Sequence, residues 1–371
     1  MKKILVTGGA GFIGSHTVEL LLKKNYSVRI LDALQERVHP HGWPNYLPSE
    51  VEKLKGDVRS SDDWAKALVD IDGIIHLAAY QDYMTDFSTF HHVNTVGATL
   101  LYEQIVEKKL KVQKVVLASS QATYGEGSYR CPNHGLQYPP PRPSTQLEIG
   151  DWDLHCPECS ATMDPVEITE DKVNPHTTYG ISKYTAELTS FALGKKYNIP
   201  TTNLRYSIVQ GARNSFYNAY SGICRIFAMR LINGSPPICY EDGNSLRDYV
   251  SVKDVANANV LCLEDSRTNG ESYNVGGLSG ISVFDFAQKI TKKINPTIRP
   301  IISQEYRFGD TRHTISSWQK IGKLGWYPKE NIDSIINEYV EWVTLQPEVK
   351  DLYTASQKHM RDMNVLRSVS T

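Results

Sequence analysis

A tyrosine and a lysine separated by four positions, Tyr179 and Lys183, are the first residues in this chain that could do chemistry. Side chains at positions i and i+4 lie on the same face of a helix, one turn apart. A phenol with a pKa of about 10 is a poor base at neutral pH, and a nearby ammonium group favours its phenolate form. The pair could therefore act as a base, although the same spacing also occurs in helices as an ordinary solvated pair.

A glycine-rich turn near the start of the chain could hold an anionic cofactor. Residues 3–6 form an apolar run that predicts a strand, and residues 15–24 predict a helix after the turn. Glycines allow a tight bend and a close backbone approach to a pyrophosphate, while the helix N-terminus offers unpaired N–H groups to the anion. The cofactor contacts expected in this turn are Gly8, Gly11, Phe12, Ile13 and Gly14.

An acidic residue, Asp32, ends the second predicted strand at residues 27–31. A carboxylate about 20 residues after such a turn accepts hydrogen bonds from the adenosine ribose and would repel a 2′-phosphate. The spacing therefore favours NAD over NADP. Asp57 would lie near the adenine, and Ala78 and Ala79 near the ribose or pyrophosphate, although Asp57 could also be an ordinary turn residue.

Strands and helices continue to alternate beyond this turn. Residues 73–79 and 114–120 read as strands, and residues 94–107 read as a helix between them. This alternation predicts an α/β fold with a doubly wound, Rossmann-type parallel sheet, because right-handed β-α-β crossovers are the simplest connections. Ligands should then gather at the carboxyl ends of the strands.

The bulk composition excludes several classes of partner. The net charge is −1 over 371 residues, which gives no reason to expect binding to nucleic acid or to an anionic membrane surface. No run reaches the roughly 18 apolar residues of a membrane span, and the N-terminus lacks a signal-peptide pattern. We therefore expect a soluble, cytoplasmic protein. Six cysteines are too few for a disulfide scaffold in a chain of this length.

Several motifs occur together in one order: residues 7–14, 77–79, 119–125, 179–183, 204–206 and 247–255, with Asn94 between the second and the third. Together they resemble the extended short-chain dehydrogenase/reductase family, in particular its NAD-dependent nucleotide-sugar epimerases and dehydratases. The resemblance implies a smaller, mixed α/β substrate domain and a homodimer formed through the helices near Asn94 and Tyr184. It implies the catalytic set Ser120, Tyr179 and Lys183. The further cofactor contacts that it implies are Val58, Leu77, Asn94, Tyr206, Tyr179 and Lys183.

The resemblance also implies a reaction. In related sugar 4,6-dehydratases an Asp-Glu pair follows the catalytic serine or threonine, whereas this chain has Gln121 and Ala122 there. Water elimination then lacks its carboxylate acid and base, which favours an epimerase that inverts C4 of a nucleotide-diphosphate sugar through a 4-keto intermediate, with Tyr179 as the base. The alternatives are a 4,6-dehydratase, a 4-keto reductase, or a catalytically silent NAD-binding sensor or scaffold.

Two arginines are candidates for the substrate diphosphate. Arg247 precedes an apolar strand, and Arg307 would close on the diphosphate from the other side, because guanidinium N–H pairs match phosphate oxygens. Gln121 and Ser207 are the other expected substrate contacts. The chain divides into an NAD-binding domain at 1–205, whose sheet part of 246–276 would complete, a nucleotide-sugar-binding domain at 206–345 and a loosely ordered tail at 346–371.

An insert at residues 126–170 carries two pairs of possible metal ligands. Cys131 and His134 form a C-x2-H pair, and Cys156 and Cys159 form a C-x2-C pair. Four such ligands suit a closed, structural zinc site, although plain cysteines or a disulfide are also possible and His155 is an alternative ligand. The insert resembles that of a subgroup of bacterial dTDP-L-rhamnose 4-epimerase-like proteins, and we expect it to overhang the sugar pocket.

Overall fold

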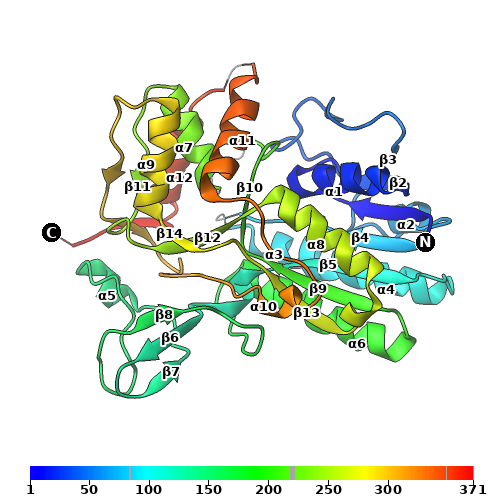
Figure 1. The fold of residues 1–371 in the computed structure, drawn as a ribbon, viewed down its shortest axis with the longest axis horizontal. Helices are drawn as coiled ribbons and strands as arrows, with labels where there is room; N and C mark the ends of the chain where they lie inside the picture. Colours follow the sequence, from blue (N-terminus) through cyan, green and yellow to red (C-terminus); the bar gives the residue numbers. More distant parts are fainter. Residues whose placement is uncertain (83–84, 218–221, 348, 371) are drawn as a thin grey trace.

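A central sheet of seven parallel strands organises the molecule (Figure 1). The computed structural model describes residues 1–82, 85–217, 222–347 and 349–370. The strand order is β13-β9-β5-β4-β1-β2-β3, so the chain runs outward in both directions from the boundary between β1 and β4. This confirms the doubly wound fold. The strands are β1 (Lys3–Thr7), β2 (Ser27–Asp32), β3 (Glu52–Lys55), β4 (Gly73–His76), β5 (Lys114–Ser120), β9 (Thr201–Tyr206) and β13 (Glu271–Val275).

The two faces of the sheet bury different helices, because successive side chains of a strand point to opposite faces. Ile4 and Val6 of β1 join an apolar core with α1 (Phe12–Lys23) and α8 (Val252–Glu264). Leu5 instead joins a core on the other face. That second core contains side chains from α2 (Ser61–Ala67), α4 (Gly97–Glu107) and α6 (Thr178–Tyr197).

Two predicted helices differ in detail from the sequence expectation. Helix α1 begins at Phe12 instead of residue 15, because Gly11 takes the N-cap position with extended backbone. The helix expected at residues 94–107 is compound: α3 (Phe87–Phe90) and a π-helical segment (His91–Val96) lead directly into α4. Single π-turns of this kind are frequent at functional sites.

A second, mixed α/β lobe follows β9, in line with the predicted fold class. Its core is formed by α7 (Ile223–Ile232), α9 (Val283–Ile294) and α11 (Ile332–Thr344), which pack together. The division at residues 205 and 206 remains our proposal. The lobe's strands are β10 (Ile208–Gln210), β12 (Leu246–Ser251) and β14 (Gly280–Ser282) in one sheet, and the pair β11 (Ile238–Cys239) and β15 (Ile301–Ile302). Further short helical segments are the 3-10 helices Gln121–Tyr124 and Ser266–Thr268, and α10 (Gln319–Gly322).

The C-terminal residues differ from the loosely ordered tail that the sequence predicts. They form α12 (Tyr353–Asp362) and β17 (Leu366–Ser368), which pairs with β16 (Glu305–Arg307). Met360 and Leu366 are buried in the core of the second lobe. Their apolar contacts come from segments distant in the sequence, so the local polar composition gives no sign of this order.

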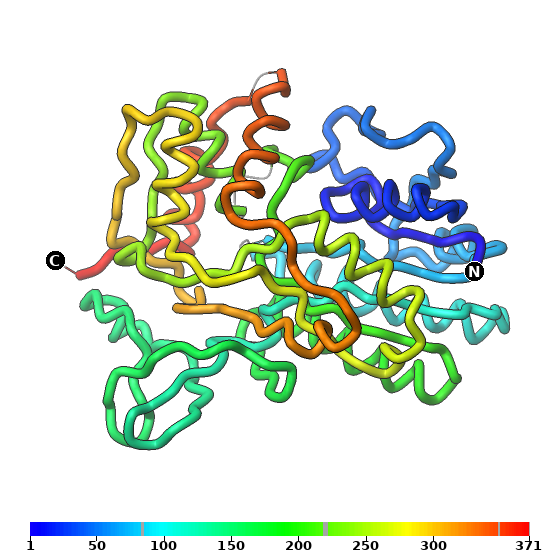
Figure 2. The backbone as a smooth tube through the Cα atoms, in the orientation of Figure 1, coloured from blue at the N-terminus to red at the C-terminus, as the bar shows by residue number. Residues whose placement is uncertain are grey.

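The cysteine-bearing insert forms a small projection of its own, seen at the lower left of Figure 1 and as the green loops at the same place in Figure 2. Strand β6 (Ser128–Cys131) lies between β7 (Gly135–Gln137) and β8 (Asp164–Val166) in an antiparallel sheet. Helix α5 (Ser144–Glu148) follows the proline-rich stretch. The insert therefore folds outside the central sheet.

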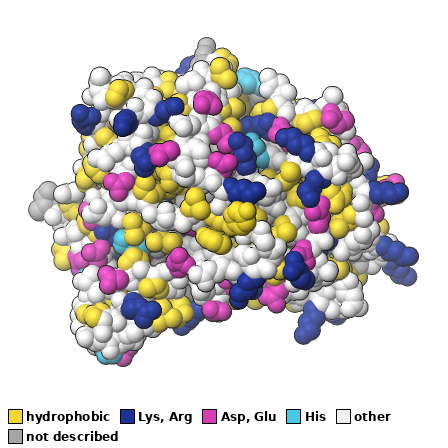
Figure 3. All heavy atoms as spheres, viewed as in Figure 1, with side chains coloured by type: hydrophobic (Ala, Val, Ile, Leu, Met, Phe, Trp, Pro, Cys, Tyr) yellow, Lys and Arg dark blue, Asp and Glu magenta, His cyan; other side chains and the backbone are white. Residues whose placement is uncertain are grey.

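Charged side chains of both signs are interspersed over the face shown in Figure 3. This distribution agrees with the net charge of −1. Within the described parts of the chain, no helix is both long and apolar enough to cross a membrane.

A buried ion pair ties α6 to the sheet and gives the first prediction. Arg205 of β9 donates to both carboxylate oxygens of Glu187, and both side chains are almost fully buried. Glu187→Gln leaves a buried guanidinium without its anion, so we expect a loss of about 3 kcal/mol in the free energy of unfolding, measured by urea titration.

The matched control is Glu264→Gln, which removes a carboxylate from the solvent-exposed pair with Lys24. That change should cost less than about 1 kcal/mol. Equal losses in the two variants would contradict the anchoring role of the Arg205–Glu187 pair.

Candidate active site

The glycine-rich turn between β1 and α1 lies at the carboxyl end of β1, next to the middle strand β4. Gly8 has a positive φ of 65°, and a Cβ atom there would lie 2.9 Å from the backbone nitrogen of Ala78. At Gly14 a Cβ atom would lie 2.1 Å from the carbonyl oxygen of Gly8. Side chains are thus excluded at these two positions, because the protein's own backbone passes close to both. The first N–H groups of α1, which include those of Phe12 and Ile13, face this turn without a capping side chain.

Asp32 closes the same turn from the end of β2. Its carboxylate accepts hydrogen bonds from the backbone N–H of Ala10, at 3.0 Å, and of Leu34, at 2.9 Å. The carboxylate is therefore held beside the glycine turn, as an acceptor for a ribose would be. Asp57, also expected near the cofactor, forms a two-point ion pair with the Arg59 guanidinium. Val58 is buried, and one of its methyl groups lies against Gly97.

A buried pair, Thr7 and His76, joins the ends of β1 and β4, the two neighbouring strands from which the chain runs outward in both directions. The Thr7 hydroxyl lies 2.7 Å from Nδ1 of His76 and accepts hydrogen bonds from the backbone N–H groups of Leu77 and Ala78. Burial lowers the pKa of His76 to about 3, and nearby Lys183 adds to the shift, so this imidazole is neutral. Sequence reasoning missed this pair, because its members lie 69 positions apart.

Tyr179 lies in the first turn of α6, directly against the segment that follows β5. A Cβ atom at Gly180 would be 2.4 Å from the carbonyl oxygen of Ala122, so only a glycine permits this approach. Thr177 caps the helix by accepting the N–H of Gly180. Ser120 ends β5, and its hydroxyl accepts the N–H of Ala122. The fold therefore brings the Tyr179 turn and the Ser120 strand end together.

Lys183 is almost fully buried on the same helix, one turn after Tyr179. Burial lowers its pKa to about 8, and the Glu187 carboxylate one further turn along opposes this shift. The ammonium group is thus charged below about pH 8, although it is buried. A charge held there would favour the phenolate form of a neighbouring tyrosine.

Asn94 joins the loop after β4 to α6. Its side chain binds both the N–H and the carbonyl oxygen of Tyr80, and its amide donates to the Ser182 hydroxyl at 2.9 Å. The ring of Phe90 meets the ring of Tyr179 edge to face, with centroids 6.4 Å apart. These contacts position the helix that carries Tyr179. The expected contact of Asn94 with the cofactor remains a prediction.

The side chains at the end of β9 and directly after it bind other groups of the protein. The Tyr206 hydroxyl donates to Asn259, and the Ser207 hydroxyl donates to the Asp248 carboxylate at 2.6 Å. Burial raises the pKa of Asp248 to about 7. The Gln121 side chain accepts from the Ser316 hydroxyl. The expected ligand contacts of these residues also remain predictions.

The two candidate phosphate arginines come from the second lobe. Arg247 donates to the carbonyl oxygens of Leu246, Thr311 and Arg312, at 2.7 to 2.8 Å. Arg307 pairs with the Asp310 carboxylate at 2.7 Å. Both guanidinium groups are held by one short segment, residues 310–312.

The four ligand atoms of the insert also come together. The donor atoms of Cys131, His134, Cys156 and Cys159 all lie within 4.8 Å of one another. Among the residues that the structure describes, this is the only group of three or more His, Cys, Asp or Glu residues with such spacing. His155 is directed elsewhere, since its Nε2 lies 2.7 Å from the Asp151 carboxylate.

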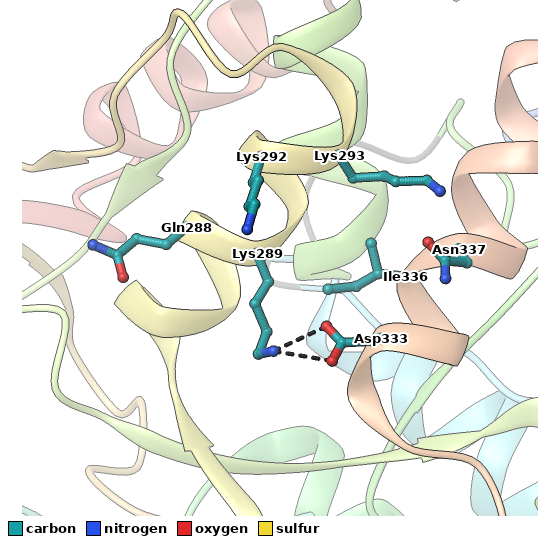
Figure 4. Close-up of a pocket in the computed structure, with 7 residues that line it drawn as sticks. All are labelled: Gln288, Lys289, Lys292, Lys293, Asp333, Ile336 and Asn337. Carbon is teal, nitrogen blue, oxygen red and sulfur yellow. Dashed lines mark hydrogen bonds and ion pairs between the residues drawn. The ribbon is translucent and has the colours of Figure 1, made fainter.

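A surface hollow of about 580 Å³ lies between α9 and α11 (Figure 4). Lysines line much of it, and Lys289 is paired with Asp333 across it. None of the candidate catalytic or cofactor residues belongs to its lining, so we assign it no part in the chemistry.

Comparisons with known proteins identify the family of this chain and relatives of its fold. The model of the NAD dependent epimerase/dehydratase family matches residues 4–146 and 158–276. The chain therefore belongs to that family, which confirms the resemblance drawn from its motifs. It is 32% identical over 358 residues to a dTDP-L-rhamnose 4-epimerase from Burkholderia thailandensis, covering 94% of this chain and 97% of that protein.

Solved structures give the same result. The fold is similar to that of a UDP-glucose 4-epimerase with UDP-glucose from Thermotoga maritima, with a TM-score of 0.74 and 28% identity over 93% of this chain and all of that one. It is also similar to a UDP-glucose 4-epimerase in complex with NAD from Thermus thermophilus, with a TM-score of 0.71, 27% identity and the same coverage.

The low pKa of Lys183 yields a prediction about stability. Because the native pKa of about 8 lies below the ordinary value of 10.5, the native protein binds fewer protons than the unfolded chain between these values. Stability should therefore rise with pH across this window, and the cost of burying the charge is fully present below pH 8. In the cofactor-free protein, Lys183→Met should raise the free energy of unfolding at pH 7 by roughly 2 to 3 kcal/mol.

Denaturant titrations at pH 7 and pH 10 would measure this gain, which should shrink at the higher pH. A variant that is less stable than the parent at pH 7 would contradict the burial cost assigned to Lys183.

Proposed function

We propose that this chain is an NAD-dependent epimerase that inverts C4 of a nucleotide-diphosphate sugar through a transient 4-keto intermediate. The observation that carries the proposal is the seating of Tyr179 and Lys183 against the end of β5, through the contact between Gly180 and Ala122. The glycine turn and Asp32 lie at the same edge of the sheet, where the carboxyl ends of the parallel strands meet. The similarity to two kinds of sugar-nucleotide 4-epimerase supports the choice of reaction.

The residues at the β1–α1 turn fit NAD. The cradle excludes Cβ atoms at Gly8 and Gly14, and Asp32 offers a carboxylate to a ribose hydroxyl. When bound, NAD would supply the hydride acceptor for C4 and the donor that restores it.

The protein's own groups would manage the proton. In this proposal the Tyr179 phenolate removes the proton of the C4 hydroxyl, and Ser120 donates a hydrogen bond to the same oxygen. Lys183 stabilises the phenolate by its charge. Return of the proton from Tyr179 to the C4 oxygen completes the inversion once the keto group has presented its opposite face.

The segment after Ser120 favours epimerisation over dehydration. Removal of water needs a carboxylic acid and a base near the sugar. Gln121 supplies an amide instead, which is bound to Ser316, and Ala122 supplies only its backbone. A 4,6-dehydratase is therefore the weaker alternative, and a 4-keto reductase would differ by consuming one NADH for each product formed. A silent NAD sensor would not need the intact set of Ser120, Tyr179 and Lys183.

Arg247 and Arg307 are proposed to bind the substrate diphosphate. Guanidinium groups form paired hydrogen bonds with phosphate oxygens, and the carbonyl and carboxylate partners of these two would hold them in place. A cytoplasmic location and a homodimer are further proposals. Exposed apolar side chains on the π-helical segment and α6, namely Val96, Ile181 and Leu188, support a self-association surface there.

The first test is direct. The purified protein is incubated with dTDP- and UDP-linked hexoses, deoxyhexoses and their C4 epimers, and proton NMR follows the C4 signal. We expect interconversion of one epimer pair without net NADH production. Absence of C4 inversion across the panel would contradict the proposed reaction.

The second test addresses the base. Tyr179→Phe removes the hydroxyl and keeps the ring, so turnover should fall at least about 100-fold, because general base catalysis contributes about 10² to 10⁴. NAD binding, measured by calorimetry, should persist. Tyr184→Phe is the matched control, since it makes the same change on the same helix, five positions along. Similar turnover in the two variants would remove Tyr179 from the mechanism.

A further inference from the structure

We propose that the insert holds one structural zinc ion on Cys131, His134, Cys156 and Cys159. We further propose that this ion fixes the insert against the second lobe, which carries Arg247 and Arg307. The first half stands independently of the reaction. The second half rests on the proposed function, because it concerns the arginines assigned to the diphosphate.

The distances between the four donors fit a tetrahedral zinc site. With Zn–S bonds of about 2.3 Å and Zn–N bonds of about 2.0 Å, a tetrahedron separates two sulfurs by about 3.8 Å and a sulfur from a nitrogen by about 3.5 Å. The Cys131 and Cys159 sulfurs are 3.6 Å apart. Nδ1 of His134 lies 3.4 Å from the Cys156 sulfur and 3.8 Å from the Cys131 sulfur. The ligand set is closed, so the role is structural.

Each ligand pair lies in a tight turn. The first occupies the turn between β6 and β7, where Gly135 has a positive φ. The second lies in a turn closed by hydrogen bonds between Cys156 and Ala161 and between Ser160 and Cys156. Turns of this kind direct both ligands of a pair toward one point.

Neighbouring groups would stabilise the charges of a zinc site, namely the thiolates and the zinc-bound imidazole. The backbone N–H of Asn133 donates to the Cys131 sulfur, and its side-chain amide donates to the Cys159 sulfur, each at 3.4 Å. The Glu158 carboxylate lies 4.0 Å from Nε2 of His134, the nitrogen that points away from the cluster. This distance is too long for a hydrogen bond, so the carboxylate acts on the imidazole only through its negative charge.

The main alternative is a disulfide, and the geometry disfavours it. A disulfide joins sulfurs at about 2.0 Å, whereas the Cys131 and Cys159 sulfurs are 3.6 Å apart and all six cysteines are free. One disulfide would also leave unexplained why His134 and the third cysteine lie beside the bonded pair. Zinc uses all four groups.

Apart from its contacts with the second lobe, the insert has only a small apolar core of its own. Its apolar core consists of Tyr129, Cys131, Leu154, Cys156 and Met163, and two of these five are the buried ligands. Units with so small a core usually need a metal or disulfide to fold. Binding energy from zinc would therefore act as folding energy for this segment.

Buried ion pairs connect the insert to the second lobe. Arg142, after the proline-rich stretch, donates to both carboxylate oxygens of Glu241. Arg312 donates to Glu241 and Asp242, and its backbone N–H binds Glu126 at the start of the insert. Arg142, Arg312, Glu126 and Glu241 are each less than 5% exposed. Such pairs are costly to separate, so the insert and this lobe should move together.

This network reaches the two candidate phosphate arginines. Arg142 donates to the carbonyl oxygen of Asp310, whose carboxylate holds Arg307. Arg247 is bound to the carbonyls of Thr311 and Arg312. An insert ordered by zinc would therefore keep residues 310–312 in place, and with them both guanidinium groups. Arg142 of the insert and Arg312 in residues 310–312 are therefore positioning residues for Arg247 and Arg307.

Metal analysis tests the zinc site. Protein purified without chelators is measured by inductively coupled plasma mass spectrometry. The parent should contain about one zinc per chain, and Cys159→Ser, which alters an exposed ligand, less than about 0.2. His155→Ala is the matched control, because it removes a histidine beside Cys156 and should keep the metal. Less than about 0.2 zinc per parent chain after growth with added zinc would overturn the site, and so would full occupancy in Cys159→Ser.

Binding of dTDP and UDP, measured by calorimetry, tests the coupling without needing turnover. Zinc-free Cys159→Ser should bind the better of the two at least about fivefold more weakly than the parent, which corresponds to roughly 1 kcal/mol, and should bind NAD equally well. Unchanged nucleotide binding in the zinc-free variant, or an equal loss in NAD binding, would overturn the coupling. If the variant does not fold, stripping the parent with 1,10-phenanthroline provides the same comparison. Failure of the epimerase assay would leave both measurements valid.

Discussion

The close approach of α6 to the segment after β5 is the contact on which the candidate site depends. A Cβ atom at Gly180 would lie 2.4 Å from the carbonyl oxygen of Ala122, so the helix can reach the strand end only through a glycine. Tyr179 precedes that glycine. Lys183 and Glu187 follow at intervals of one turn, and Glu187 is anchored on Arg205 of the sheet. One helix therefore carries the proposed base, its cation and the anchor that fixes both.

This arrangement places the Lys183 ammonium group in the protein interior, where water cannot solvate its charge. Burial lowers the pKa of Lys183 to about 8, and the neutral imidazole of His76 lies nearby at the end of β4. A cation that is costly to bury interacts strongly with any charge that forms beside it. Burial of Lys183 thus lowers the free energy of unfolding, but it places the cation where it would stabilise a Tyr179 phenolate. Stability and function are in tension at this site.

The sequence predicts the parts of the site that depend on local spacing. The glycine turn, Asp32 at the end of β2 and the Tyr179–Lys183 pair each follow from residues close together in the chain, and so do the two ligand pairs of the insert. The Thr7–His76 pair and the Arg142–Glu241 pair do not, because their members meet only after the chain has folded. The order of the C-terminal tail has the same origin, since Leu366 is buried through the pairing of β17 with β16.

The central claim is that C4 is oxidised and then reduced within one active site. It is tested most directly with a sugar nucleotide deuterated at C4, once an active epimer pair is known. The account predicts that the epimerised product keeps the deuterium at C4, measured by mass spectrometry and NMR, because the same hydride leaves and returns. Loss of the label to solvent during epimerisation would show that C4 exchanges a proton instead, and would contradict the account.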